Sequence, residues 1–354
     1  MQLGIIGMPM VGKTTIFGLL TGSIDKGGSQ GKTNIAIAKI PDARIDYLSG
    51  VFKPKKTTLA QLEVVDIPGL MPGGEKSAAL FLDGVRKADA LLHVVRLFDN
   101  DAVPSVNDSI DPIRDIETVT YELLLSDLDL IEKRIDRINK NKKRNQMLKE
   151  LNLLEKLKDA LSDEKPISSV SIDDEEQEIM NTYQFLTNKP LLICLNLNEN
   201  DIKNGVYAHR EEVLQYTGKL QLPVVELAAS IEKEIAELEP EEKDMFLEEL
   251  GITESGLLKI SRSMYQRLGL ISFFTVGEDE VKAWTIEAGT NARKAASKIH
   301  SDIERGFIRA EVVEYQHFKD LGSMTAIKEK GLFRLEGKEY IIKDGEIVHF
   351  RFNV

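Results

Sequence analysis

Residues Gly7-Met8-Pro9-Met10-Val11-Gly12-Lys13-Thr14 form the stretch that decides the fold. The spacing is G-x-x-x-x-G-K-T, with an apolar run before it (residues 3–6) and an apolar run after it (residues 16–20). This order predicts a strand, a phosphate-binding loop and a helix, in which backbone N–H groups, the helix dipole and Lys13 face phosphate oxygens. The alternative is an ordinary strand-to-helix turn that happens to end in Lys-Thr. We predict a nucleotide phosphate site formed by Met8, Pro9, Met10, Val11, Gly12, Lys13, Thr14 and Thr15.

The composition is that of an ordinary globular protein of two or three domains, with 354 residues, 42% apolar and 29% charged. No run approaches the roughly twenty apolar residues of a membrane span, and no signal peptide is recognisable, so we expect no membrane partner. Cys194, the single cysteine, lies in an apolar run, which excludes disulfides and favours a reducing cytoplasm. The net charge of −12 argues against broad nucleic-acid binding, and we expect no DNA partner. We expect a monomer.

Three further apolar runs read as strands: residues 62–66, 90–95 and 190–195. Their alternation with helical segments predicts an α/β fold, a mostly parallel sheet with helices on both faces. Ligands bind such sheets at the carboxyl ends of the strands, where the polar motifs of this chain fall. We predict a P-loop NTPase G domain from residues 1–113 and 187–271.

Residues 66–69, Asp-Ile-Pro-Gly, end one predicted strand. In P-loop proteins a D-x-x-G aspartate reaches Mg²⁺, usually through water, and the glycine N–H faces the γ-phosphate. A strand-ending turn is the alternative. We predict Mg²⁺ held by Thr14 and, through water, by Asp66, with Lys13 and the Gly69 backbone assisting catalysis. Leu70 follows, where a hydrolytic G protein often has a glutamine that orients water.

Residues 196–199, Asn-Leu-Asn-Glu, close another predicted strand in the place of the guanine-reading motif N-K-x-D. Glu199 displaces the carboxylate by a methylene and Leu197 replaces the lysine. Adenine lacks the donors that this carboxylate reads, so the change favours ATP, or relaxed choice, over GTP. The alternative is that Asn196 only caps a turn. The predicted base site comprises Asn196, Leu197, Glu199, Ala228, Ala229 and Ser230.

Residues 114–186 predict an inserted helical coiled-coil hairpin, because apolar residues recur there at spacings of three and four. Its predicted tip is the most basic place in the chain. Two interpretations stay open for the tip: a solvated helix end, or a contact with RNA phosphates. The candidate contact residues are Lys140, Lys142, Lys143 and Arg144.

Residues 272–354 predict a β-grasp module of short strands crossed by one helix. The predicted strands include residues 272–276, 283–286, 340–342 and 347–350. Asp344-Gly345 predicts a two-residue hairpin between the last two strands. His93, in the middle of an apolar strand, is interpreted as a core histidine with satisfied hydrogen bonds and not as a catalytic group.

The chain resembles the Obg-like ATPases, the YchF branch of the translation-factor-related P-loop G proteins, over essentially its whole length. The resemblance rests on the P-loop, on residues 65–70, 93–96 and 196–199, and most specifically on residues 273–277, 283–286, 299–302, 306–311 and 350–354. It implies a coiled-coil insert and a C-terminal TGS domain. It also implies a cytoplasmic, Mg²⁺-dependent NTPase that prefers ATP and acts on or near ribosomes and in stress responses.

The departures from the family pattern lie in the chemical parts. Met10 stands where the family usually has asparagine, and the glycine-rich stretch after Leu70 is shorter. Thr33 is the available switch I threonine and a candidate Mg²⁺ ligand. Ser105 stands where the family tends to have a histidine implicated in hydrolysis, and serine cannot carry a proton comparably at neutral pH. Three hypotheses stay open: a slow ATPase, a nucleotide-sensing module with little turnover, and a GTP-binding protein.

Overall fold

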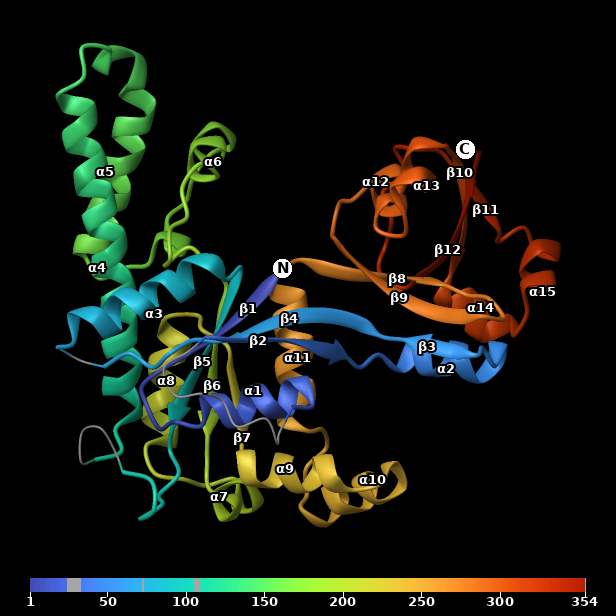
Figure 1. The fold of residues 1–354 in the computed structure, drawn as a ribbon, viewed down its shortest axis with the longest axis horizontal. Coiled ribbons are helices and arrows are strands. Elements are labelled where there is room, and N and C mark those ends of the chain that lie inside the picture. The colour runs from blue at the N-terminus through green and yellow to red at the C-terminus, as the bar shows by residue number, and fades with distance from the viewer. Residues whose placement is uncertain (24–32, 72, 105–108, 354) are drawn as a thin grey trace. The chain divides into compact units, whose positions relative to one another are not determined.

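The computed structural model describes residues 1–23, 33–71, 73–104 and 109–353, except for the side chains of residues 240, 241 and 244. The chain divides into two compact units, each made of two segments (Figure 1). The first unit comprises Met1–Ala36 and Glu63–Ile260, and the second comprises Ile37–Leu62 and Ser261–Val354. Residues 37–62 thus belong to the C-terminal unit, whereas the boundaries predicted from sequence place them in the G domain. Among the described residues, no helix has the length and apolar character needed to cross a membrane.

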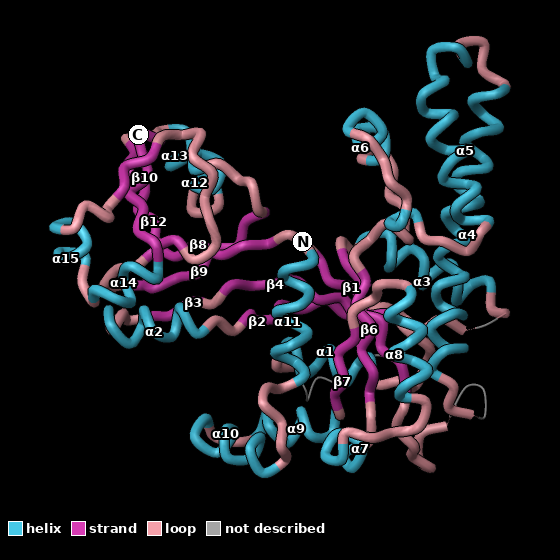
Figure 2. Tube along the Cα trace, turned by 180° about the vertical axis from the view of Figure 1, so that it is seen from behind, coloured by secondary structure: helices cyan, strands magenta, loops and turns pink. Residues whose placement is uncertain are grey.

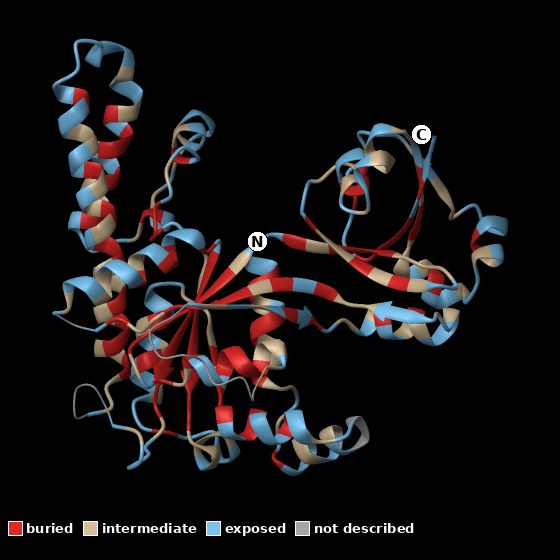
Figure 3. Cartoon of the chain, in the orientation of Figure 1, coloured by how far each residue is buried: buried red, intermediate tan, exposed pale blue. Residues whose placement is uncertain are grey.

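The first sheet has six strands in the order β2-β4-β1-β5-β6-β7. The pairs β1–β4, β1–β5, β5–β6 and β6–β7 are parallel. Strand β5 is buried at every position, as the red central strands in Figure 3 show, because helices cover both faces of the sheet. The predicted parallel sheet is confirmed. The strands are β1 (Gln2–Ile6), β2 (Asn34–Ile40), β4 (Ala60–Asp66), β5 (Ala90–Arg96), β6 (Leu191–Asn196) and β7 (Val224–Leu227).

The helices of this sheet fall into two groups. Helix α1 contacts α9, whereas α3 and α8 contact α4. Ile116 of α4 and Val213 of α8 pack with strand residues such as Val95 and Ile193 in one apolar cluster. The helices are α1 (Lys13–Thr21), α3 (Glu75–Lys87), α4 (Pro112–Asn139), α7 (Glu199–Asn204), α8 (Arg210–Lys219), α9 (Ala229–Glu237), α10 (Pro240–Glu249) and α11 (Gly256–Arg267).

Helix α4 continues away from the sheet and packs against α5 (Leu148–Ser162), as Figures 1 and 2 show. Buried leucines and isoleucines, among them Ile131 and Leu154, form the interface. The buried carboxylate of Asp127 accepts hydrogen bonds from the backbone N–H groups of Leu186 (2.9 Å) and Thr187 (2.8 Å), which fixes the returning chain to α4. Short helices complete the segment: η1 (Arg144–Met147), η2 (Ile167–Ser169) and α6 (Asp174–Met180).

The second sheet also has six strands, in the order β11-β10-β12-β8-β9-β3. Strands β8 and β9 are antiparallel, β12 runs parallel to β8, and Phe273 and Phe350 meet edge to face in the core. The strands are β3 (Lys56–Thr58), β8 (Leu270–Thr275), β9 (Glu280–Glu287), β10 (Phe307–Glu314), β11 (Arg334–Glu336) and β12 (Glu346–Phe352). The helices are α2 (Ala43–Phe52), α12 (Ala292–Ser297), α13 (Ser301–Arg305), α14 (Tyr315–Leu321) and α15 (Met324–Glu329).

The predicted hairpin at Asp344-Gly345 is wrong. Residues 340–342 hold only an isolated bridge from Ile341 to Asn291, and β12 pairs with β10 and β8 instead. The Asp344 carboxylate accepts a hydrogen bond from the N–H of Ser272 (2.9 Å), and the N–H of Gly345 donates to the Ser272 carbonyl (2.8 Å). Contacts to a strand far away in sequence therefore overrode the local turn signal.

Candidate nucleotide-binding site

The loop between β1 and α1 depends on two glycines, each with a positive φ and no room for a Cβ atom. Gly7 (φ +139°) and Gly12 (φ +97°) both have backbone angles that side chains rarely adopt. A Cβ atom on Gly12 would lie 2.4 Å from the Asn196 side-chain nitrogen, and one on Gly7 would lie 2.3 Å from the Val94 carbonyl oxygen. The backbone of the loop can therefore lie directly against the ends of β5 and β6.

Lys13 is the first residue of α1 and is 8% exposed. Its ammonium donates to the carbonyl oxygens of Met8 (2.6 Å) and Gly7 (3.3 Å), which folds it over the loop. Burial lowers the pKa of Lys13 to about 8, and the nearby Asp66 carboxylate opposes that shift. A Cβ atom on Gly69 would lie 2.9 Å from Lys13 Nζ and from Pro9 N. The D-x-x-G turn and the phosphate-binding loop are thus in contact, as the motif predicts.

Thr14 and Asp66 form the candidate Mg²⁺ site. The exposed Thr14 hydroxyl donates to Asp66 Oδ2 at 2.8 Å. Burial raises the pKa of Asp66, partly offset by the Thr14 hydrogen bond, the Lys13 charge and a hydrogen bond from the Asn34 side chain. A hydroxyl and a carboxylate oxygen in contact are hard oxygen ligands of the kind that Mg²⁺ takes together with water and nucleotide phosphates. The described residues contain no cluster of three or more His, Cys, Asp or Glu side chains that could hold a metal without such help.

Asn196 joins three segments. Its side-chain nitrogen donates to the Val11 carbonyl (3.0 Å), and its side-chain oxygen accepts from the N–H of Ala229 (3.1 Å). Both bonds are buried and link residues far apart in sequence. The interpretation of Asn196 as a simple turn cap is therefore wrong, because it ties the phosphate-binding loop to the segment Ala228–Ser230.

The rest of the predicted base site differs in character. Leu197 is buried in the apolar cluster with Ile116 and Val213, so its side chain is turned away from any ligand. Glu199 opens α7, is 42% exposed at its side chain and pairs with Lys203 at 2.6 Å. Ala228 and Ala229 are buried, and Ser230 is exposed. Of these residues, Glu199 and Ser230 have side chains that reach solvent.

Met10 has a positive φ of +61°, which is strained for a side chain of this type. Asparagine, which the family usually has at this position, tolerates that conformation better. Met10 is half exposed, whereas Met8 and Val11 are buried beneath the loop. Thr15 is exposed and Pro9 lies against Gly69. Methionine in place of asparagine at position 10 therefore raises the conformational energy of the loop and leaves the buried residues Met8 and Val11 unchanged.

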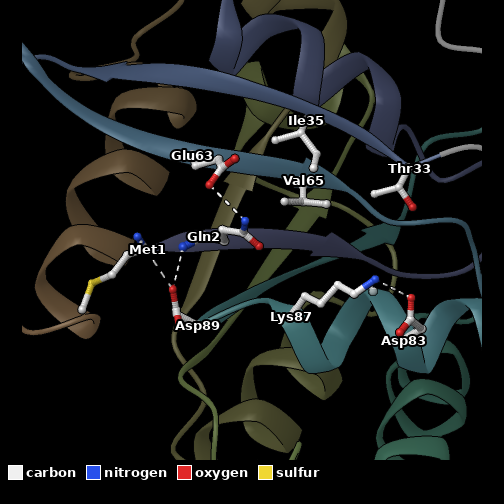
Figure 4. Close-up of a pocket in the computed structure, with 10 residues that line it drawn as sticks. Met1, Gln2, Thr33, Ile35, Glu63, Val65, Asp83, Lys87 and Asp89 are labelled. Carbon is white, nitrogen blue, oxygen red and sulfur yellow. Dashed lines mark hydrogen bonds and ion pairs between the residues drawn. The ribbon is translucent and has the colours of Figure 1, made fainter.

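Thr33 lines a separate hollow of about 560 Å³, shown in Figure 4. The polar residues of this hollow pair with one another: Lys87 with Asp83 (2.7 Å), and Gln2 with Glu63 (3.0 Å). Asn34, the residue after Thr33, is among the groups that lower the pKa of Asp66 against the effect of burial. Sequence analysis missed Asn34, whose only signal was a polar residue at the start of a strand.

Leu70 and Arg96 shape the surroundings of the phosphate site. Leu70 is 2% exposed and its N–H donates to the Gly7 carbonyl (3.2 Å), so its side chain belongs to the core. The Arg96 guanidinium donates to the carbonyls of Phe98, Val103 and Pro104 and lies 4.5 Å from the Phe98 ring centroid. Arg96 thereby fixes the loop that leads to Ser105, which lies outside the described residues.

His93 is buried as predicted, yet its hydrogen bonds are not satisfied. Neither ring nitrogen has a hydrogen-bond partner within the part of the chain that the structure describes. Burial lowers the pKa of His93 to about 3, with a smaller contribution from the Lys13 charge, so the ring is neutral. The interpretation as a satisfied core histidine is wrong in this respect, because satisfaction depends on neighbours that the sequence does not reveal.

The basic tip of the hairpin lies between α4 and α5. Lys140, Lys142, Lys143 and Arg144 are exposed, and none of them pairs with a carboxylate of the described residues. Arg144 donates instead to the Asn139 side chain (2.9 Å). By contrast, Lys133 and Arg134 nearby are paired, with Asp129 and Glu150. The tip is therefore the part of the hairpin whose charges are available to a partner.

The glycine-supported loop, the lysine folded over it, and the Thr14–Asp66 contact define a P-loop nucleotide-binding protein. Residues 2–126 match the MMR_HSR1 family model, described as a 50S ribosome-binding GTPase. Residues 270–353 match the YchF-GTPase_C model, described as a protein of unknown function (DUF933). The chain belongs to the YchF/Obg-like ATPase family.

The relatives cover nearly the whole chain. The Ribosome-binding ATPase YchF of Bacillus subtilis is 42% identical over 99% of both chains. Obg-like ATPase 1 of Oryza sativa is 38% identical and covers 100% of this chain and 92% of its own. The solved structure of the Schizosaccharomyces pombe YchF GTPase has a TM-score of 0.90 at 31% identity, covering 99% of this chain and 97% of that one. The resemblance stated from sequence is confirmed.

Proposed function

We propose that this chain is a Mg²⁺-dependent ATPase of low intrinsic rate that acts on the ribosome in the cytoplasm. One observation carries the proposal: the same loop holds a buried Lys13, bonded to a loop carbonyl, and is followed by the Thr14–Asp66 contact. A bound triphosphate would be a further partner of the ammonium, which has three N–H donors and uses two of them on the Met8 and Gly7 carbonyls. Similarity to proteins named as ribosome-binding ATPases supports the same activity.

The residues at the site fit a Mg²⁺ ion. Thr14 and, through water, Asp66 would hold it, and the ion would neutralise charge on the phosphoryl oxygens. Lys13 and the Gly69 N–H would contribute further positive charge toward the same oxygens. The first turn of α1 contains no acidic residue that would weaken the attraction of its N-terminus for phosphate.

ATP is the proposed nucleotide because the two residues that depart from the guanine-reading motif, Leu197 and Glu199, offer guanine no free acceptor side chain. The Glu199 carboxylate is paired with Lys203, and Leu197 is buried in the core. A site that discriminates strongly for guanine has to leave buried polar groups unpaired when another base binds. Exposed and already paired groups carry no such penalty. GTP binding through a rearranged Glu199 is the alternative.

Slow turnover follows from the surroundings of the γ-phosphate position. Leu70 has an apolar side chain turned into the core, so it cannot orient water. This observation favours a second candidate, a nucleotide-sensing protein whose output is affinity for a partner and whose turnover is negligible. Single-turnover hydrolysis of ATP with and without ribosomes separates the two. We expect slow phosphate release that ribosomes accelerate, and absence of release in both conditions would leave only the sensing function.

The hairpin tip is the proposed ribosomal RNA contact. Its lysines and arginine are exposed and free of carboxylate partners among the described residues, so they can neutralise phosphates. Replacing Lys142, Lys143 and Arg144 with glutamate should weaken co-sedimentation with ribosomes, most clearly at low salt. The matched control makes the same change to glutamate at Lys149, Lys156 and Lys165, which pair with carboxylates. Equal binding of both variants across a salt series would remove the tip from the interface.

A further inference from the structure

Strand β7 is an outer strand of the first sheet, and its free edge carries backbone groups without partners. It pairs on one side only, with β6. The carbonyls of Pro223 and Leu227 accept hydrogen bonds from β6, so the N–H and C=O groups of Val224 and Glu226, which alternate with them, face away from the sheet. Within the described residues no hydrogen bond reaches these four groups. The edge therefore offers two donors and two acceptors in a row.

A hollow of about 410 Å³ runs along this edge between two walls. Arg210 and Leu214 of α8 line one wall, and Ile231 of α9 and Ile252 line the other. Helix α8 packs with α4, whereas α9 packs with α1, so the walls come from opposite faces of the sheet. The hollow thus continues the plane of the sheet beyond β7, as the place of one further strand would.

The second wall is held in place by a buried carboxylate. Glu232 of α9 is 4% exposed and accepts hydrogen bonds from the Ser255 hydroxyl (2.8 Å) and from the N–H of Gly256 (2.5 Å). A Cβ atom on Gly256 would lie 2.5 Å from Leu227 Cβ, so the start of α11 lies directly against β7. These contacts fix the wall and leave the outward backbone groups of β7 uncovered.

The first wall carries a polar atom without a partner. Arg210 Nε is buried and makes no hydrogen bond within the described part of the chain. Its ion-pair partner, Glu226 Oε1, is 3.6 Å away and already accepts a hydrogen bond from the Tyr207 hydroxyl (2.6 Å). A buried N–H without an acceptor costs free energy, which an acceptor from outside the chain would recover.

We propose that β7 is a docking edge for an extended protein segment, which adds a seventh strand to the sheet and places an acidic side chain against Arg210. The inference rests on the proposed ribosome binding and assigns the segment to a protein of the ribosome. Backbone hydrogen bonds to Val224 and Glu226 provide affinity, and alternate side chains of the segment face Leu214 and Ile231. RNA has no such row of backbone donors and acceptors. A second copy of the chain would bring its own two walls to the edge, whereas a single extended segment brings none.

The first test compares two variants in co-sedimentation with purified ribosomes. E226P removes one outward N–H and places a ring at the edge, where strands tolerate proline. E226A loses the same carboxylate and keeps the N–H, so it is the matched control. We expect ribosome binding to be at least about tenfold weaker for E226P and within about threefold of wild type for E226A, with the affinity for an ATP analogue unchanged in both.

Two outcomes of this comparison have different meanings. Equal ribosome binding by E226P and E226A would overturn the docking edge. A wild-type protein that does not bind ribosomes would instead refute the proposed function.

A second measurement needs no substitution and decides the case if E226P does not fold. Hydrogen–deuterium exchange of the wild-type protein, with and without ribosomes, should show that the N–H groups of Val224 and Glu226 exchange fast when free and slowly in the complex. Unchanged exchange would overturn the proposal. Protection that needs no ribosome and grows with protein concentration would also overturn it, because a second copy would then cover β7. A photo-reactive residue in place of Lys259, which lines the hollow, should cross-link to ribosomal protein, and cross-links to RNA alone would contradict the proposal.

Discussion

The phosphate half and the base half of the nucleotide site are built differently. Lys13, Asp66 and Asn196 are buried, and each is hydrogen-bonded to the loop or to the helix that follows it. Glu199 and Ser230 lie at the surface, and the Glu199 carboxylate pairs with Lys203. The phosphate-binding groups are thus held in place by the core, whereas the choice of base depends on exposed groups that can move at a low cost in free energy. Substitutions in the two halves should accordingly have very different effects.

The largest effect should come from Lys13. K13A removes the ammonium that would bind the outer phosphates, and we expect at least ~100-fold weaker binding of an ATP analogue, equivalent to ~3 kcal/mol. Calorimetric titration measures it. K165A, which removes an exposed lysine paired with Asp163, is the matched control and should bind as wild type does. Equal losses in the two variants would mean that net charge, and not the loop geometry, attracts the nucleotide.

Asp66 should have the next largest effect. D66N keeps the shape of the side chain but removes the charge that would hold Mg²⁺ through water. We expect the Mg²⁺ concentration for half-maximal binding of the ATP analogue to rise by about 10- to 100-fold. D163N, at an exposed aspartate, is the control. An unchanged Mg²⁺ requirement in D66N would place the ion elsewhere.

Acid should destabilise the phosphate half through His93. The folded protein takes up this proton only near pH 3, whereas the unfolded chain takes it up near pH 6.5. Between these values the unfolded state binds more protons, so the unfolding free energy falls as pH falls below 6.5. At about pH 5 the loss attributable to His93 should be about 2 kcal/mol.

Urea unfolding at about pH 5 and pH 7.5 measures this loss by comparing wild type with H93Q. The difference between the two pH values should shrink in H93Q. It should persist in H209Q, because His209 is exposed and contacts Glu212. The same pH dependence in all three proteins would show that His93 does not carry it.

The base half should respond least. E199D restores the carboxylate position of the guanine-reading motif, and we expect GTP affinity to rise several-fold, at most about tenfold, while ATP affinity changes by less than about twofold. E199Q is the control for charge and should change neither by more than about twofold. A large loss of ATP affinity in E199D would show that the base half is as rigid as the phosphate half.

The phosphate half was predictable because its function requires glycines and a lysine at fixed spacing. Gly7, Gly12 and Lys13 lie where backbone geometry allows few alternatives, and the parallel sheet follows from continuous apolar runs such as β5. The contact of Thr14 with Asp66 was predictable too. Asp66 ends β4, Thr14 lies in the first turn of the helix after β1, and the carboxyl ends of parallel strands meet at one edge of the sheet.

Other features depend on neighbours that a sequence does not identify. Asn34 belongs to no motif, and its influence on the pKa of Asp66 depends on β2 lying beside β4. The two side-chain bonds of Asn196 depend on packing between segments far apart in the chain, and so does the lack of a partner for the His93 ring among the described residues. Asp344-Gly345 has a strong local signal for a hairpin turn, yet both residues hydrogen-bond to the backbone of Ser272 instead of closing a hairpin. Local patterns therefore predicted the parallel sheet and the phosphate-binding loop better than the partners of individual polar groups.

The most direct test of the account is calorimetric titration of the Mg²⁺-containing protein with non-hydrolysable ATP and GTP analogues, side by side. We predict that both bind through the shared phosphates and that ATP binds more tightly, because the Glu199 carboxylate is paired with Lys203 and is not held free for guanine. Tighter binding of GTP would contradict the account of the base half. Binding of neither analogue would contradict its central claim, that the loop around Lys13 is a working nucleotide site.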